Sequence, residues 1–103
     1  MTSSISDRPV VEFRGELITR KLGRMNRNHL NNLLEKHESI AVDLSAVEMM
    51  TPSFTDECFG MLALAMGVEA FQKRVRLTGA TLDLKHLVTA VIGQRLRGGS
   101  PPP

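Results

Sequence analysis

A short apolar run followed closely by a helix start is the feature of this sequence that most constrains its fold. The run covers residues 40–44, Ile-Ala-Val-Asp-Leu, and is typical of a strand inside a sheet that is covered on both faces. Thr51 can cap a helix, and Pro52 suits the first helical position because its missing N–H has no partner there. The sequence therefore predicts a central strand that leads into an apolar helix over residues 52–66.

Strand and helix patterns alternate over the rest of the chain. Alternating apolar residues predict a first strand over residues 9–14, and Gly15-Glu16 predicts a turn that begins a hairpin. A third strand is predicted over residues 74–78 and a last helix over 82–96. Because such alternation gives a mainly parallel sheet, we expect an α/β fold with a small, mainly parallel sheet of three to five strands and three helices.

The first of these helices is predicted over residues 19–37 and is amphipathic. Its buried stripe is expected to hold Leu22, Met25, His29, Leu30 and Leu33. The opposite face is wet and basic, with Arg20, Arg24, Arg27, Asn28 and Asn31.

Length and composition indicate one small domain. A chain of 103 residues buries about 60–65% of its unfolded surface, enough for a single core. We expect a flexible N-terminus over residues 1–8, the domain over 9–97 and a flexible tail over 98–103. No signal peptide and no apolar run of about 20 residues is present, so we expect a cytoplasmic protein without a membrane partner. Cys58 is expected to be a core residue.

Charge falls into three blocks along the chain. Residues 1–37 carry a net charge of +3, residues 38–72 carry −6, and residues 73–103 carry +5. The acidic block contains the predicted helix start after the central strand. We therefore expect the partner of this region to be a basic protein surface.

The central motif resembles that of STAS domains, the fold of the anti-sigma factor antagonists. The resemblance is carried by Asp43-Leu44-Ser45-Ala46-Val47 and by Thr51-Pro52-Ser53-Phe54-Thr55-Asp56-Glu57, followed by Phe59, Gly60 and Leu62. More narrowly, this second run is similar to a STAS-like family of largely unassigned function. Gly15-Glu16-Leu17 resembles the turn after the first STAS strand, so the resemblance spans about residues 10–97.

The resemblance does not carry phosphorylation over directly. Sporulation-type antagonists have Asp-Ser-Ser-Gly here and are phosphorylated on the first serine, whose position is occupied by Pro52. Proline has no hydroxyl. We expect Thr51 and Ser53 to cap the helix, and the alternative is that one of these two neighbours accepts the phosphate instead.

The carboxyl ends of the strands are where function tends to gather in such folds, which indicates the predicted loop over residues 45–51. The helix after it has one face for the sheet, and its other face is small and apolar apart from Asp56. We interpret that second face as a docking surface, the alternative being that a neighbouring element covers it. The candidate partner-binding residues are Glu48, Thr51, Ser53, Asp56, Gly60 and Leu64.

An enzyme is not expected, because the residues for one do not converge. Ser53 could act as a nucleophile with Asp56 or Glu57, but the three histidines, at 29, 37 and 86, are poorly spaced for it. Metal-ligand spacing and phosphate-binding glycine loops are lacking, so no metal or cofactor is expected. Nucleic acid is a further alternative and is not favoured; its phosphates would lie along Arg14, Arg20, Lys21, Arg24 and Arg27.

The sequence thus predicts a non-catalytic, regulatory protein-binding module. The resemblance implies an antagonist or adaptor whose partner is a histidine-kinase-like ATPase or an anti-sigma factor. An exposed sheet edge is also expected, which a homodimer could cover.

Overall fold

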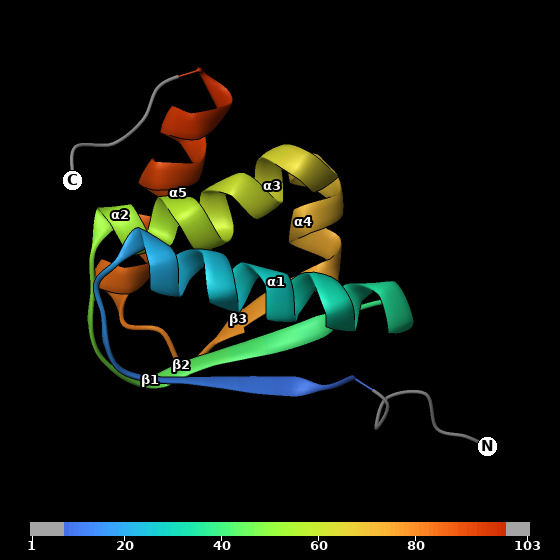
Figure 1. Ribbon diagram of the computed structural model, residues 1–103, viewed down its shortest axis with the longest axis horizontal. Helices are drawn as coiled ribbons and strands as arrows, with labels where there is room; N and C mark the ends of the chain where they lie inside the picture. Colours follow the sequence, from blue (N-terminus) through green and yellow to red (C-terminus); the bar gives the residue numbers. More distant parts are fainter. Residues whose placement is uncertain (1–7, 99–103) are drawn as a thin grey trace.

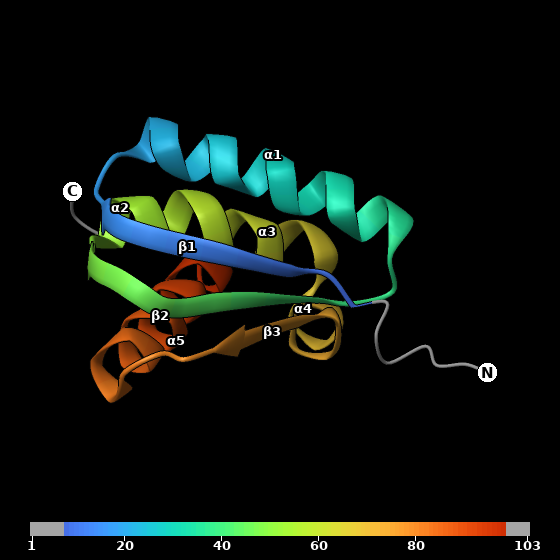
Figure 2. The same cartoon turned by 90° about the horizontal axis from the view of Figure 1, so that it is seen from below.

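The computed structural model describes residues 8–98, which form a parallel sheet with all of their helices on one side. Figures 1 and 2 show the helical layer from the side and the bare face of the sheet from below. The elements are β1 (Val10–Leu17), α1 (Arg20–Lys36), β2 (Ile40–Met50), α2 (Pro52–Thr55), the π-helical turn η2 (Asp56–Gly60), α3 (Met61–Met66), α4 (Val68–Arg74), β3 (Val75–Thr78) and α5 (Leu82–Leu96). Apart from Arg8 and Gly98, the two predicted flexible ends lie outside the described residues.

The predicted α/β class with a small parallel sheet of three to five strands is confirmed: the described residues form three strands in the order β1-β2-β3, with β2 at the centre. The prediction that both faces of the sheet are covered is wrong. Ile40, Val42 and Leu44 face the helices and are buried. Ala41 is buried on the open face because it pairs with Val10 on one side and Arg76 on the other, whose larger side chains flank it. This shielding explains why the run resembles a doubly covered strand.

All four phenylalanines of the chain lie in the core between the sheet and the helices. Phe13 of β1 packs edge-on against Phe54 of α2 (ring centroids 6.0 Å apart) and stacks on Phe59 of η2 (5.8 Å). Phe59 in turn packs edge-on against Phe71 of α4 (6.5 Å). Cys58 is fully buried beside them, as expected, and burial raises the pKa of its thiol.

The first strand does not end in a turn at Gly15. Gly15 has a positive φ of 71° inside β1, where the pairing with β2 changes register. Glycine adopts this conformation without strain, so β1 continues to Leu17, which pairs with Met50. The predicted hairpin is therefore wrong. So is the predicted loop over residues 45–51, because the long β1 gives β2 a partner as far as Met50.

Helix α1 has the predicted bounds, and its predicted buried stripe is right for Leu22, Leu30 and Leu33, which pack in or against the core, but wrong for Met25 and His29. Thr19 caps it by accepting a hydrogen bond from the Leu22 N–H (3.0 Å). Its buried residues are Gly23, Leu30 and Leu34, whereas Met25 is 57% exposed and His29 is exposed as well. A Cβ at Gly23 would lie 2.8 Å from the Phe54 carbonyl oxygen. The close approach of α1 to α2 at this glycine, which the apolar stripe did not reveal, sets the rotation of the helix.

The second helix is present over its predicted residues, and one further helix was missed. Residues 52–66 form a continuous helical segment whose middle turn, η2, has π geometry. Gly67 ends it with a φ of 91°, a backbone conformation that only glycine takes readily. Helix α4 then begins at Val68 and was not predicted. The prediction of three helices therefore omits α4.

Candidate functional site

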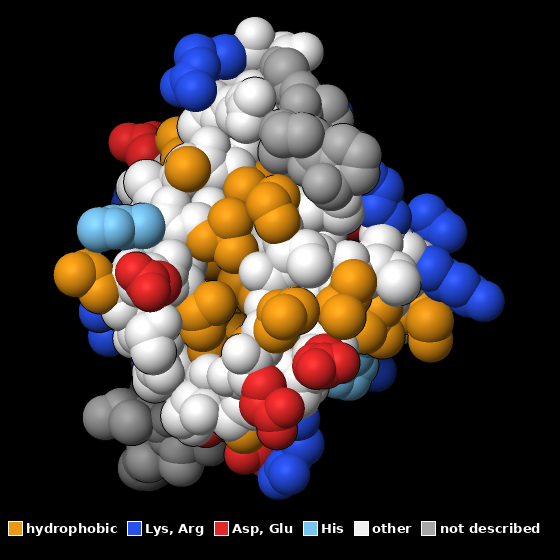
Figure 3. All heavy atoms as spheres, turned by 90° about the vertical axis from the view of Figure 1, so that its left-hand side faces the viewer, with side chains coloured by type: hydrophobic (Ala, Val, Ile, Leu, Met, Phe, Trp, Pro, Cys, Tyr) orange, Lys and Arg blue, Asp and Glu red, His pale blue; other side chains and the backbone are white. Residues whose placement is uncertain are grey.

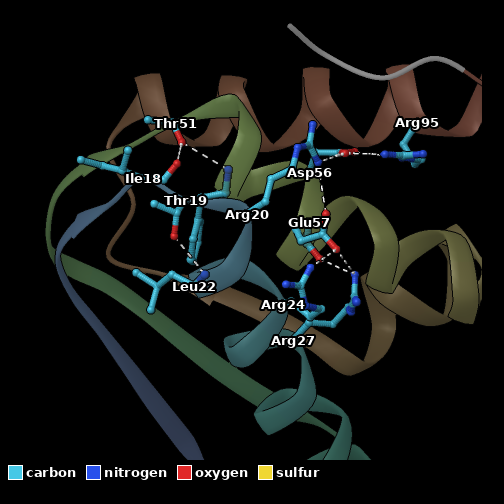
Figure 4. A network of polar contacts seen from close by, with 11 residues as sticks. Ile18, Thr19, Arg20, Leu22, Arg24, Arg27, Thr51, Asp56, Glu57 and Arg95 are labelled. Atoms are coloured by element: carbon cyan, nitrogen blue, oxygen red, sulfur yellow. Dashed lines mark hydrogen bonds and ion pairs between the residues drawn. The ribbon is translucent and has the colours of Figure 1, made fainter. Parts of the chain in front are cut away.

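Thr51 fixes the point where β2 passes into α2. Its N–H donates to the Leu17 carbonyl oxygen (3.0 Å), and its hydroxyl donates to the Ile18 carbonyl oxygen (2.6 Å). The same hydroxyl accepts from the Phe54 N–H (3.2 Å), with Pro52 at the helix start (Figure 4). The predicted cap is thus confirmed for Thr51. Because the contacts reach the end of β1, they hold both strand ends in place.

Asp56 is fully buried and ion-paired, so the expectation that it is exposed for docking is wrong. The Arg95 Nε donates to Asp56 Oδ1 (2.9 Å), and Arg95 Nη2 contacts Oδ2. Arg20 Nη1 also donates to Oδ2 (2.9 Å). Burial alone would raise the pKa of Asp56, but the hydrogen bonds from Arg95 and Arg20 outweigh it and the pKa is lowered. Asp56 therefore joins η2 to both α1 and α5.

Glu57 is held by three arginines of α1. Its carboxylate lies 3.2 Å from Arg20 Nη1, 3.3 Å from Arg27 Nη1 and 3.9 Å from Arg24 Nη1. Arg27 also donates to the Glu57 carbonyl oxygen (2.7 Å), and Figure 4 shows these side chains converging from α1. The acidic block was expected to face a basic surface of a partner protein. For Asp56 and Glu57, arginines of the same chain supply that basic surface. The same pairing engages Arg20, Arg24 and Arg27 of the predicted phosphate-binding face, although only Arg27 is largely buried.

Gly60 makes room for this arrangement. A Cβ there would lie 2.8 Å from Asp56 Oδ1 and 3.6 Å from Val91 Cγ1 of α5. Gly60 and Ala63 are buried. The predicted docking face of the second helix is thus wrong at Asp56 and Gly60, because α5 covers it, as the alternative reading held.

The remaining candidates are divided between two places. Leu64 is 48% exposed on α3, twelve residues or about 18 Å along the helix from Pro52. Glu48 is exposed near the end of β2, and Ser53 is buried at 9% exposure. The structure therefore does not bring the six candidate residues together into one surface.

The residues for a hydrolase do not converge either. Within residues 8–98, the Ser53 hydroxyl has no hydrogen bond to a base, and both nearby acids are held by arginines. His29 and His86 are exposed on α1 and α5. In the same described part of the chain, no group of three or more His, Cys, Asp or Glu could hold a metal ion. No helix found there is both long and apolar enough to cross a membrane.

An exposed apolar surface does lie at the carboxyl ends of the strands. We call it the end surface and define it by Ile18, Met49, Pro52 and Leu82, of which Ile18, Met49 and Leu82 are 41%, 50% and 67% exposed. Figure 3 views this end, where hydrophobic side chains gather over the strand ends and the starts of α2 and α5. Sequence reasoning missed Ile18, Met49 and Leu82. Ile18 and Leu82 each adjoin a helix-capping threonine, Thr19 and Thr81, and Met49 lies two residues before the third, Thr51; these positions were the available signal.

The family comparison agrees with the fold and the motif. The model of the STAS-like domain of unknown function (DUF4325) matches residues 25–85, more than half of the chain. No curated protein and no solved structure matches the sequence. The matched region includes β2, the Thr51 cap, η2 and β3. The chain belongs to the STAS-like domain family of unknown function.

Proposed function

We propose that this domain is a non-catalytic regulatory module that binds a protein partner through the end surface. The observation that carries the proposal is the exposure of Ile18, Met49 and Leu82 at one end of the sheet. Exposed apolar side chains that gather in this way mark interaction sites. The Thr51 hydrogen bonds hold the strand ends beneath them, so the surface is preorganised and loses little freedom on binding.

The partner that we propose is a histidine-kinase-like ATPase or an anti-sigma factor in the cytoplasm, as the STAS resemblance implies. Exposed Glu48 next to Met49 favours a partner patch that is apolar with a basic rim. Pro52 offers no hydroxyl, and the Thr51 hydroxyl is already both donor and acceptor. We therefore propose that the partner is regulated by occupancy of this surface, without phosphate on Thr51 or Ser53. Stoichiometric phosphate on either residue after incubation with a bound kinase would contradict this.

The test uses capture followed by affinity measurement. The full chain and its Met49→Glu and Leu82→Glu variants are used as bait in a lysate of the source cells. A captured ATPase or anti-sigma factor is then purified and titrated by calorimetry. We expect each variant to lose at least about tenfold in affinity, because a charge enters a desolvated apolar contact.

Leu64→Glu is the matched control, since Leu64 is as exposed as Met49 but lies on α3. It should melt normally and bind as the wild type does. If Leu64→Glu abolishes binding and Met49→Glu does not, docking occurs on α3 and the proposal is wrong. Binding that falls steeply with salt and is lost in Lys21→Glu would instead indicate a nucleic acid.

A further inference from the structure

The outer edge of β3 lies on the opposite side of the sheet from β1 and is open. The strand order β1-β2-β3 leaves β3 paired on one side only, by its register from Ile40↔Val75 to Asp43↔Thr78. Figure 2 shows the other side of β3 uncovered by any strand of the described residues. Every second residue of such an edge directs its N–H and C=O outward, where they can pair with another strand.

An apolar groove runs alongside this edge between α4 and α5. It has a volume of about 510 Å³, within the range of roughly 300–1,000 Å³ that ligand sites occupy. Val68 and Phe71 line it from α4, and Val88, Ile92 and Leu96 from α5. A strand laid against β3 would direct alternate side chains into this groove.

The rim of the groove is basic. Lys73 and Arg76 line it and are exposed, and its lining contains no acidic residue. Neither side chain forms an ion pair within residues 8–98. Arg76 alternates with buried Val75 in β3, so it stands on the open face of the sheet. The two faces of an added strand would therefore meet an apolar groove on one side and a positive charge on the other.

We propose that β3 accepts an extended acidic segment of a protein partner as a fourth strand. Its apolar residues fill the groove, its alternate acidic residues lie beside Arg76 on the open face, and its backbone completes the sheet. Lys73 of α4 adds a positive charge at the rim of the groove. A second copy of this chain fits less well, because pairing two β3 edges would bring their Lys73 and Arg76 side chains together. This binding site is separate from the end surface and independent of the function proposed above.

The test uses the full chain and a short fluorescein-labelled peptide in which valine alternates with glutamate. We expect saturable binding by fluorescence anisotropy and amide shift changes that concentrate on residues 75–78 in NMR spectra. Arg76→Glu should weaken binding at least about tenfold. Lys21→Glu, the same charge reversal at an exposed site on α1, should leave it unchanged.

Two further peptides separate the contributions of charge and backbone. A version with lysine in place of glutamate should bind at least about tenfold more weakly. A version with alternate backbone nitrogens methylated, which cannot complete the sheet, should also lose binding. Absence of binding at about 1 mM peptide, equal affinity for the lysine peptide, or shift changes away from β3 would each overturn the proposal. Concentration-dependent dimerisation that shifts the β3 amides would overturn it too, because a second copy would then be the occupant.

Discussion

Two neighbouring regions of this molecule reverse the usual distribution of side chains: one buries charged residues and the other exposes apolar ones. At η2, the acids Asp56 and Glu57 are buried or nearly so, with side-chain exposures of 0% and 16%, and are held by arginines of α1 and α5. We call Asp56, Glu57, Arg20, Arg27 and Arg95 the buried ion cluster. The end surface, by contrast, presents Ile18 and Met49 to solvent beside half-buried Pro52. The charged residues of the family motif thus belong to the architecture, whereas apolar side chains next to the motif are exposed.

The two regions should also respond differently to substitution. A buried ion pair contributes little net stability when formed, but removal of one partner is strongly destabilising because it leaves a buried charge unpaired. An exposed apolar residue contributes little to folding and can contribute much to binding. Substitutions in the buried ion cluster should therefore change the free energy of unfolding, and those in the end surface should change only the affinity for a partner.

The largest effect is expected from Asp56→Asn. The substitution keeps the size of the side chain but removes the charge that Arg20 and Arg95 share, and it should lower the free energy of unfolding by about 3 kcal/mol. Urea denaturation followed by circular dichroism measures it. Asp83→Asn, at an exposed acid in the first turn of α5, is the control and should cost less than about 1 kcal/mol. Similar losses in both variants would remove the distinction between the two regions.

The contribution of Asp56 should also disappear in acid. Its folded-state pKa is lowered, so the stabilisation is complete above the ordinary aspartate pKa of about 3.9 and is lost as the pH falls through the folded value. The stability difference between the wild type and Asp56→Asn should be constant near neutral pH and shrink below about pH 4. Urea midpoints measured over this range test the sign. A difference that grew in acid would mean that Asp56 is protonated in the fold.

Gly60→Ala should have an intermediate effect. The new methyl group would lie 2.8 Å from Asp56 Oδ1, which Arg95 holds in place. Overpacking of this kind lowers the free energy of unfolding by about 1–3 kcal/mol, and the better helix propensity of alanine offsets up to about 1 kcal/mol of that loss. We expect a net loss of about 1–2 kcal/mol by thermal and urea denaturation. In Gly93→Ala the nearest atom is Arg97 Nη1 at 3.4 Å, so this control should be neutral or slightly stabilising; a loss equal to that of Gly60→Ala would argue against the packing explanation.

Local patterns in the sequence were sufficient to predict the order of the main elements. The alternation around Phe13, the apolar run at Ile40 and the Thr51-Pro52 helix start each act within a few residues, and each lies in the predicted element. The length of β2 could not be predicted in this way. It depends on the bulge at Gly15, which determines how far a strand distant in the sequence can pair with it.

The burial of Asp56 also depends on distant residues, although part of it had a local signal. Arg20, Arg24 and Arg27 are spaced i, i+4 and i+7 on α1 and therefore form one stripe that can meet an acidic segment. Arg95 is 39 residues from Asp56, and no periodicity relates the two. The docking face predicted on the second helix failed for the same reason, because the packing of α5 is not encoded in the helix that it covers.

The smallest change in stability is expected at the end surface. Measuring it distinguishes the end surface from the core. Met49→Ser and Leu82→Ser each remove an apolar side chain that is at least half exposed, so each should alter the free energy of unfolding by less than about 0.5 kcal/mol. Leu30→Ala, at a fully buried residue of α1, provides the scale and should cost about 2–5 kcal/mol. If Met49→Ser approached that value, Met49 would be part of the core and the end surface would not be free to bind. If both serine variants are as stable as the wild type, any affinity that the corresponding glutamate variants lose is a loss of contact at the surface.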